Sequence, residues 1–290
     1  MESNTRVKKS RWIKDRVFFV GVCLFSGLTA IPLVLIIWEV LKKGYRQLNW
    51  SFFTEEAPNS LEAMMAVNAG DLIPGGVANG LIGSLLMVLM AIVIAVPIGI
   101  LAGIRLSEHP ESKFSGIVRS VAELLQGTPS IVIGLIIYGW VVKPLGSYSG
   151  FAGGIALAML MLPLIIRSTE ETLKMLPGSL KEAGLALGAS YSTVILRVLL
   201  PSAFGGLFTG ILLAVSRVLG ETAPLMLTAL GASAIEWNIF APMSALPLQI
   251  WEFYNDPNLA GLIWSTSLFL LLLILTLNLL AKRIARKWKI

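Results

Sequence analysis

Two charged side chains lie inside an otherwise uncharged, apolar stretch of the sequence. Arg217 and Glu221 fall within residues 204–230, and no other side chain there carries a charge. A charge at the centre of a bilayer costs about 2.5–3.5 kcal/mol on insertion scales, so such residues usually face a protein interior or a water-filled cavity. Because they are four residues apart, the two side chains are predicted to share one face of a helix.

Two interpretations of this pair stay open. In the first, the pair is structural, and the two charges neutralise each other so that the helix can insert. In the second, Glu221 holds Arg217 until an anion arrives and Arg217 then binds the anion, because its planar guanidinium stays charged and matches phosphate oxygens. A neighbouring carboxylate would help release, since an ion path must not bind its ion too tightly.

A second polar feature interrupts another uncharged stretch. Thr128 and Ser130 flank Pro129 within residues 124–142. A break in a membrane helix frees backbone groups that protein or cavity water must satisfy. The pattern therefore predicts either a polar notch that an anion could use or a plain proline kink.

These residues need a scaffold of membrane-spanning helices. Of the 290 residues only 14% are charged, against about 25% in soluble domains, which excludes a single water-soluble globule. A helix needs about 20 apolar residues to cross a bilayer. Glycines in the second stretch, Gly99 and Gly103 among them, are predicted to allow close helix packing. Six stretches predict an all-α membrane protein of six transmembrane helices: 17–38, 78–104, 124–142, 151–166, 204–230 and 259–281.

The rare residue types exclude several kinds of site. The sequence has one cysteine, Cys23, and one histidine, His109. These counts exclude an internal disulfide, a cysteine metal cluster and a paired-histidine metal site. A Gly-rich phosphate loop ending in Gly-Lys-Ser or Gly-Lys-Thr is missing as well, so the chain does not supply ATP chemistry itself. We therefore expect no catalytic residue, no metal and no cofactor.

Lysine and arginine are distributed unevenly between the predicted loops. With six spans, 18 of the 23 lie on one side and four on the other, while Arg217 lies within a span. Because basic residues concentrate in cytoplasmic loops, both termini are predicted to be cytoplasmic. The predicted organisation is a basic N-terminus (1–16), a first helix (17–38), an external loop (39–77), a transmembrane domain (78–281) and a basic cytoplasmic tail (282–290).

The predicted cytoplasmic loop 167–203 is too long for a simple turn. Ser179 is a plausible N-cap with Glu182 three residues later, the spacing of a capping box. Gly188 is predicted to end this short helix, and Pro201 to open or kink the next one. The loop would then be either a docking surface for another protein or an amphipathic helix on the membrane surface.

The same loop resembles the signature of ABC-importer permeases, which reads Glu-Ala-Ala, three residues, Gly, nine residues, Ile, one residue, Leu-Pro. Here Gly184 replaces the second alanine and Val198 replaces isoleucine, and the spacing matches throughout. The resemblance implies the type I permease fold and a coupling helix that docks on a separate ATPase subunit. The residues that it implicates in coupling are Glu182, Ala183, Gly184, Gly188, Leu200 and Pro201.

Three further stretches, residues 126–134, 162–171 and 220–225, resemble permeases of phosphate-specific importers, and the last, Gly-Glu-Thr-Ala-Pro-Leu, is similar to the PstA family. The resemblance implies a multi-pass protein of the bacterial cytoplasmic (inner) membrane that moves inorganic phosphate by alternating access. It implies a PstC-like second permease, two PstB-like ATPase subunits and a PstS-like phosphate-binding protein as partners. It also points to Arg217 and Glu221 on the path and to Arg167 at its inner exit.

Three alternatives to phosphate import remain at this point. The chain could carry another oxyanion, such as phosphonate, sulfate or molybdate. It could be a membrane enzyme acting on lipid phosphates, although it lacks a metal cluster or a histidine–carboxylate constellation. It could also be a passive channel, which would conduct without nucleotide.

Overall fold

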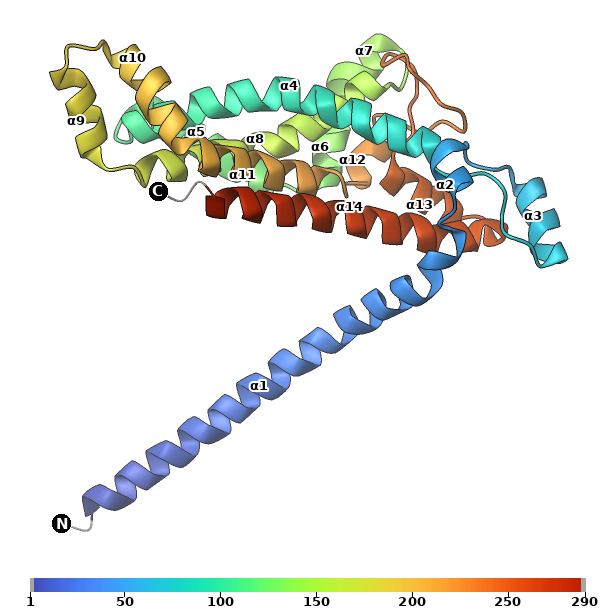
Figure 1. The fold of residues 1–290 in the computed structure, drawn as a ribbon, viewed down its shortest axis with the longest axis horizontal. Helices are drawn as coiled ribbons and strands as arrows, with labels where there is room; N and C mark the ends of the chain where they lie inside the picture. Colours follow the sequence, from blue (N-terminus) through green and yellow to red (C-terminus); the bar gives the residue numbers. More distant parts are fainter. Residues whose placement is uncertain (1–2, 288–290) are drawn as a thin grey trace.

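The described part of the chain is almost entirely helical, which confirms the predicted all-α class. The structure is a computed structural model that describes residues 3–287. Within this range, pairing of extended chain is limited to one isolated bridge between Leu230 and Met243. Long helices lie side by side along the long axis of the molecule, and α1 (Ser3–Gly44) stands away from them (Figure 1).

The remaining helices vary widely in length. The α-helices are α2 (Trp50–Thr54), α3 (Ser60–Ala69), α4 (Ala78–Glu108), α5 (Lys113–Gly127), α6 (Ser130–Ile137), α7 (Lys143–Leu145), α8 (Gly150–Lys174), α9 (Gly178–Ala186), α10 (Tyr191–Val194), α11 (Leu200–Val218), α12 (Ala223–Met226), α13 (Leu246–Tyr254) and α14 (Ala260–Lys287). Two 3-10 helices, η1 (Tyr45–Gln47) and η4 (Pro257–Leu259), and two π-helical turns, η2 (Tyr138–Val142) and η3 (Ile195–Leu199), complete the set for the described residues.

Five continuous helical segments are long and apolar enough to cross a membrane. The first, second, fourth and sixth predicted stretches lie inside four of them. The five segments are Lys14–Gln47, Ala78–Glu108, Gly150–Lys174, Tyr191–Val218 and Pro257–Arg286.

The third predicted stretch, 124–142, is interrupted at Pro129, as the sequence predicted. Helix α5 ends at Gly127, α6 begins at Ser130, and the two are bent by 107°. Pro129 explains the corner, because proline lacks an N–H and favours an extended residue before it. Thr128 is indeed extended, with φ −77° and ψ 132°. A sixth span exists only if this bent pair is taken as one.

The fifth predicted stretch, 204–230, is displaced toward the N-terminus. Its helix starts at Tyr191 and stops at Val218. Pro224 explains the early end, because its ring would clash with the carbonyl group of Gly220 in a continuous helix. Residues 219–230 instead form a turn and the short helix α12.

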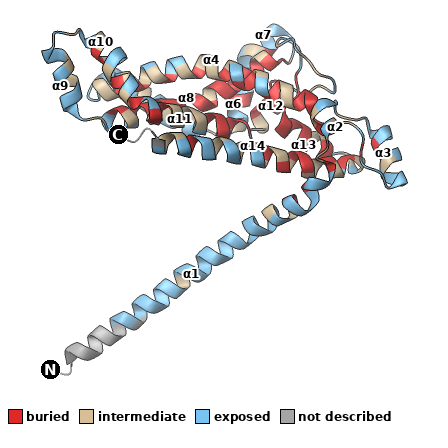
Figure 2. Cartoon of the chain, viewed as in Figure 1, coloured by how far each residue is buried: buried red, intermediate tan, exposed pale blue. Residues whose placement is uncertain are grey.

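Helix α8 lies at the centre of the packed helices. In its membrane-spanning window 61% of residues are buried, against 28% in α4 and none in α1, and Figure 2 shows the same gradient from red to pale blue. The largest apolar cluster surrounds α8. It includes Met87, Ile133, Leu157, Met161 and Leu225.

Two glycines bring α4 against α8, as predicted. A methyl group added at Gly99 would lie 2.6 Å from Cγ2 of Ile165, and one added at Gly103 would lie 2.5 Å from Cβ of Thr169. Both distances are too short for real carbon atoms, so a larger side chain would force the two helices apart. Helices α4 and α8 therefore form one tightly packed unit.

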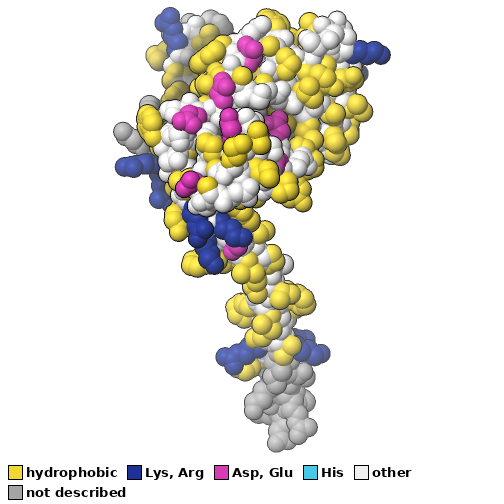
Figure 3. Space-filling model, turned by 90° about the vertical axis from the view of Figure 1, so that its right-hand side faces the viewer, with side chains coloured by type: hydrophobic (Ala, Val, Ile, Leu, Met, Phe, Trp, Pro, Cys, Tyr) yellow, Lys and Arg dark blue, Asp and Glu magenta, His cyan; other side chains and the backbone are white. Residues whose placement is uncertain are grey.

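The two ends of the molecule are made of different elements. Helices α9 and α10 lie at one end, where α14 also finishes, and α2, α3 and α13 lie toward the other (Figure 1). We call these the α9 end and the α3 end. Seen from the α3 end, Asp and Glu side chains gather on the face, and Lys and Arg lie at its edges and along α1 (Figure 3).

The α3 end is closed by a buried polar network around Asn79, which is 2% exposed. Its amide nitrogen donates to the carbonyl oxygens of Ala232 (2.7 Å) and Ser233 (3.1 Å). Its amide oxygen accepts from Nε2 of Gln249 (2.6 Å) and from the backbone nitrogen of Ala57 (3.3 Å). One side chain thus joins α4, α13 and two loops.

Candidate functional site

Arg167 and Arg217 line one cavity of about 310 Å³ between α8 and α11. Each helix contributes four residues to its wall, and Glu171 supplies the single carboxylate. Gly210 permits the close approach of the two helices, because a methyl group there would overlap the hydroxyl group of Ser168. The structure thus brings together two arginines that the sequence separates by 50 positions.

The cavity wall holds two guanidinium groups and one carboxylate, and a second carboxylate lies close to it. Nε of Arg167 donates to Glu171 at 2.9 Å. Nε of Arg217 lies 4.0 Å from Oε1 of Glu221. The two groups form an ion pair, but this distance is too long for a hydrogen bond. The side chain of Arg217 is 49% exposed, so its guanidinium is open to solvent or to an anion. Each guanidinium group thus has one carboxylate nearby, and an anion that takes the place of these carboxylates could bind both arginines.

The predicted shared helix face of Arg217 and Glu221 is wrong. Arg217 lies in the last turn of α11, and Glu221 follows the end of that helix. The amide nitrogen of Glu221 still donates to the carbonyl oxygen of Val218, at 3.1 Å. The two side chains remain within ion-pair distance because this turn folds Glu221 back toward the helix end.

Thr128 and Ser130 are placed elsewhere. Neither is among the described residues that line the cavity with Arg217. The hydroxyl group of Thr128 donates to the carbonyl oxygen of Leu124 at 2.6 Å, which satisfies a group freed at the end of α5. The proline corner accounts for this arrangement without an anion.

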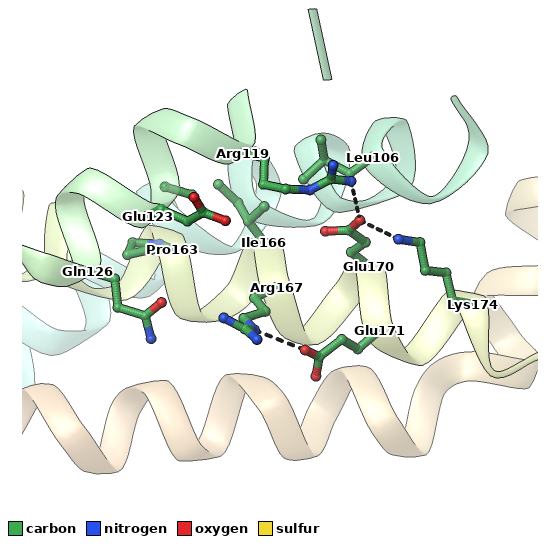
Figure 4. Close-up of a pocket in the computed structure, with 11 residues that line it drawn as sticks. Leu106, Arg119, Glu123, Gln126, Pro163, Ile166, Arg167, Glu170, Glu171 and Lys174 are labelled. Atoms are coloured by element: carbon green, nitrogen blue, oxygen red, sulfur yellow. Dashed lines mark hydrogen bonds and ion pairs between the residues drawn. The ribbon is translucent and has the colours of Figure 1, made fainter. Parts of the chain in front are cut away.

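A second cavity of about 190 Å³ lies beside the first and shares Arg167 and Glu171 with it. At its centre, one oxygen of Glu170 accepts from Nη2 of Arg119 (2.8 Å) and from Nζ of Lys174 (2.6 Å), as Figure 4 shows. Glu170 is 8% exposed, so its charge is compensated by both partners. Lys174 could have been predicted as a partner of Glu170, because the two are four residues apart on one helix. Arg119 lies on α5, 51 residues from Glu170, and no local pattern in the sequence marks it as a partner.

Helix α9 carries the residues implicated in coupling. Glu182 and Ala183 are exposed on it. Gly184 faces the neighbouring α10, where an added methyl group would lie 2.9 Å from Val194. Gly188 has φ +80°, a conformation that glycine adopts without strain, and it ends the helix as predicted.

The predicted cap of α9 is wrong. The helix begins at Gly178 after Pro177, and no side chain caps it. Ser179 therefore lies inside the first turn. Ser190 is a true N-cap at the next helix, where its hydroxyl group accepts from the backbone nitrogen of Thr193.

The helix that carries Arg217 is continuous with α10. Residues 191–218 run without interruption through the π-helical turn η3. At the end of this turn the amide nitrogen of Leu200 donates to the carbonyl oxygen of Ile195, five residues back. The π-helical turn η3 comes just before Pro201, which lies in the first turn of α11. Pro201 therefore lies inside the continuous helix 191–218 and marks neither of its ends.

Helices α9 and α10 are also joined to the end of α4. The same carboxylate oxygen of Glu108 accepts from Nζ of Lys181 and from the hydroxyl group of Tyr191. The hydrogen bond to Glu108 raises the pKa of Lys181 above its ordinary value. Lys181 is therefore a permanent cation in this contact at neutral pH.

Among the residues that the structure describes, no group of three or more His, Cys, Asp and Glu side chains could hold a metal ion. The two cavities are lined instead by arginine, lysine and carboxylate groups. Their chemistry is reversible ion pairing.

Comparison with known proteins assigns the family. The family model described as "Binding-protein-dependent transport system inner membrane component" matches residues 95–290. The phosphate transport system permease protein PstA of Yersinia pestis is 37% identical over 292 residues, covering 100% of this chain and 96% of that protein. PstA of Xylella fastidiosa strain 9a5c is 39% identical over 255 residues, covering 87% of this chain and 85% of its own length.

A solved structure supports the fold independently. An inward-facing form of the MetNI methionine ABC transporter aligns with a TM-score of 0.58 and 21% identity, covering 72% of this chain and 92% of that one. This likeness confirms the predicted ABC-importer permease fold. The chain belongs to the binding-protein-dependent transport permeases and, within them, to the PstA family of phosphate transport permeases.

Proposed function

We propose that this chain forms half of the membrane path of an ATP-driven phosphate importer. The observation that carries the proposal is the pair Arg167 and Arg217 on one cavity between α8 and α11. Two guanidinium groups can share the oxygens of one tetrahedral oxyanion. The similarity to phosphate transport permeases of the PstA family supports phosphate as that anion.

Paired carboxylates keep this binding reversible. Glu171 holds Arg167, and Glu221 lies near Arg217. An arriving phosphate displaces both carboxylates, and they reclaim the arginines when it leaves. The ion is bound firmly enough to enter and weakly enough to be released.

ATP is used on another subunit. The sequence has no phosphate-binding loop of the Gly-Lys-Ser/Thr type, and the chain belongs to a permease family. We propose that α9, with Glu182, Ala183, Gly184 and Gly188, docks on a PstB-like ATPase. The complete importer then contains two such ATPase subunits, a PstC-like second permease and a PstS-like phosphate-binding protein.

The distribution of basic residues supports an orientation. The segments at the α9 end, residues 105–123, 167–203 and 282–287, carry 11 lysines and arginines, and residues 288–290 of the predicted basic tail lie outside the described range. We propose that this end faces the cytoplasm with both termini, and that the α3 end faces outward, in the inner membrane of a bacterium.

Uptake by the reconstituted complex tests the proposal. Arg217→Gln should abolish ATP-driven uptake of labelled phosphate, while Arg217→Lys, which keeps the charge but loses the fork, should retain part of it. Arg286→Gln, an exposed arginine at the end of α14, is the control and should transport normally. Sulfate, molybdate and phosphonate serve as competitors. Wild-type rates in Arg217→Gln, or stronger inhibition by another oxyanion than by unlabelled phosphate, would contradict the proposal.

A further inference from the structure

One carboxylate at the α9 end joins three helices. Glu108 is the last residue of α4, and its side chain is only 10% exposed. Both of its hydrogen-bond donors, Lys181 on α9 and Tyr191 at the start of α10, reach the same oxygen. The ammonium group of Lys181 also lies 4.9 Å from the centre of the Tyr191 ring. We call these three residues the Glu108 joint.

The two arginines of the cavity have different links to α9. Arg217 lies on the helix that continues directly from α10 through η3. Arg167 lies on α8, which is separated from α9 by residues 175–177. A second route to Arg167 runs through the Glu108 joint into α4, because Gly99 and Gly103 pack α4 closely against α8.

We propose that the Glu108 joint transmits movement of α9 to α4 and α8, so that an ATPase docked on α9 changes the positions of both arginines. The inference rests on the proposed function and adds a mechanical element to it. Glu108, Lys181 and Tyr191 are positioning residues, since they line neither cavity. Without the joint, α9 would act on α8 only through residues 175–177, and Arg167 would follow the movement of α9 less closely.

Transport per ATP hydrolysed is the first test, in the complete importer reconstituted in liposomes. Glu108→Gln and Lys181→Met should still assemble with the ATPase and hydrolyse ATP. The amount of phosphate moved per ATP should fall roughly fivefold or more, because fivefold is the smallest effect that is typical of coupling between two sites. The control is Lys113→Met, which removes an exposed lysine at the start of α5 and should leave the ratio unchanged.

Charge exchange separates transmission from a loss of structure. The double variant Glu108→Lys with Lys181→Glu recreates the ion pair in reverse and should restore most of the lost ratio. A wild-type ratio in Glu108→Gln, or a double variant no better than either single variant, would overturn the inference. Failure of the unaltered importer to move phosphate with ATP would instead overturn the proposed function.

A distance measurement tests the joint independently of the substrate. Spin labels at Leu187, which is 88% exposed next to α9, and Leu101, which is 69% exposed on α4, are placed in a Cys23→Ser background. In the protein with the joint intact, the distance between the two labels should stay constant when ATP and vanadate are added. In the double variant Tyr191→Phe with Glu108→Gln, the same distance should change. Equal behaviour of the two proteins would overturn the inference, even if other variants fail to assemble.

Discussion

The α3 end and the α9 end are held together by different kinds of contact. At the α3 end, Asn79 is buried and all of its hydrogen bonds are to uncharged groups. At the α9 end, which also has an apolar cluster around Val194, the polar contacts between helices are made mainly to the carboxylates of Glu108 and Glu170. Their cationic partners, Lys181, Arg119 and Lys174, have side chains that are 33%, 39% and 47% exposed.

This difference determines which end rearranges at lower cost. A buried neutral group that loses its partner costs about 1–3 kcal/mol, because nothing replaces the lost bond. Opening one ion pair of the α9 end costs less, about 0–1 kcal/mol, because the released cation is a third to a half exposed and returns to water while the carboxylate keeps its second donor. The α9 end can therefore change its contacts readily, whereas opening the α3 end needs free energy from a bound partner.

The largest effect is expected from removing the hub of the α3 end. Asn79→Leu strands the carbonyl groups of Ala232 and Ser233 and the amide of Gln249, and the summed loss should be about 3 kcal/mol or more of unfolding free energy. Thermal and denaturant unfolding of the purified chain in detergent measures it. Asn255→Leu, an exposed asparagine on the same side, is the control, and equal losses in the two variants would show that the buried network around Asn79 is not the cause.

The next largest loss of stability is expected from substitutions in the packing of α4 against α8, which connects the two ends. Gly103→Ala places a methyl group against Thr169, and forcing α4 from α8 should cost about 1–3 kcal/mol. Gly116→Ala is the matched control, because nothing lies within 4 Å of a methyl group there, and it should be neutral or stabilising by up to about 1 kcal/mol. Equal unfolding temperatures for the two variants would refute the tight α4–α8 unit.

A smaller effect that depends on pH is expected at Glu252, on α13 at the α3 end. Burial raises the pKa of this carboxyl group above its ordinary value of 4.5. The folded protein then binds the proton more tightly than the unfolded chain, so its stability contribution is present below pH 4.5 and is lost as pH rises through the folded pKa.

Glu252→Gln should therefore raise the unfolding temperature at neutral pH, and the gain should vanish in acid. Unfolding scans on either side of pH 4.5 measure this, with the exposed Glu111→Gln as control. A gain that persists in acid would show that charge at Glu252 is not its cause.

The smallest effect should come from the ion pairs of the α9 end. Arg119→Gln removes one of two partners of Glu170, and it should lower the unfolding free energy by less than about 1 kcal/mol. The loss should shrink further in high salt, which screens exposed charges. Unfolding at low and high salt, beside Lys113→Gln, checks this. A loss as large as that of Asn79→Leu would reverse the comparison of the two ends.

Local patterns in the sequence predicted a large part of the fold. Long uncharged stretches predicted the helices α1, α4, α8 and α14, because length and hydropathy suffice to identify a membrane helix. Gly188 was predicted to end α9, and its positive φ explains why. The break at Pro129 was predicted, and the helix ends that were wrong lie near two other prolines, Pro177 and Pro224.

Contacts between distant residues could not be predicted in this way. Glu108 and Lys181 are 73 residues apart, and Arg119 and Glu170 are 51 apart. Nothing local in the sequence marks such partners, because they meet only after helices have packed. Arg167 and Arg217 were both selected from the sequence, but their common cavity depends on the close approach of α8 and α11 at Gly210.

Helix α1 has a different consequence for assembly. It meets the packed helices near Gly44, where an added methyl group would overlap Trp264 and Leu268, and none of the apolar clusters in the described residues includes a residue from 3–44. At about 1.5 Å per residue its 42 residues extend about 63 Å. Its last turns pack on α14, where Val40 is buried and the hydroxyl group of Ser265 donates to the carbonyl oxygen of Gly44 at 2.7 Å, whereas no side chain described between residues 11 and 39 is buried. That stretch of the rod is left for contacts within the bilayer with lipid or with another protein.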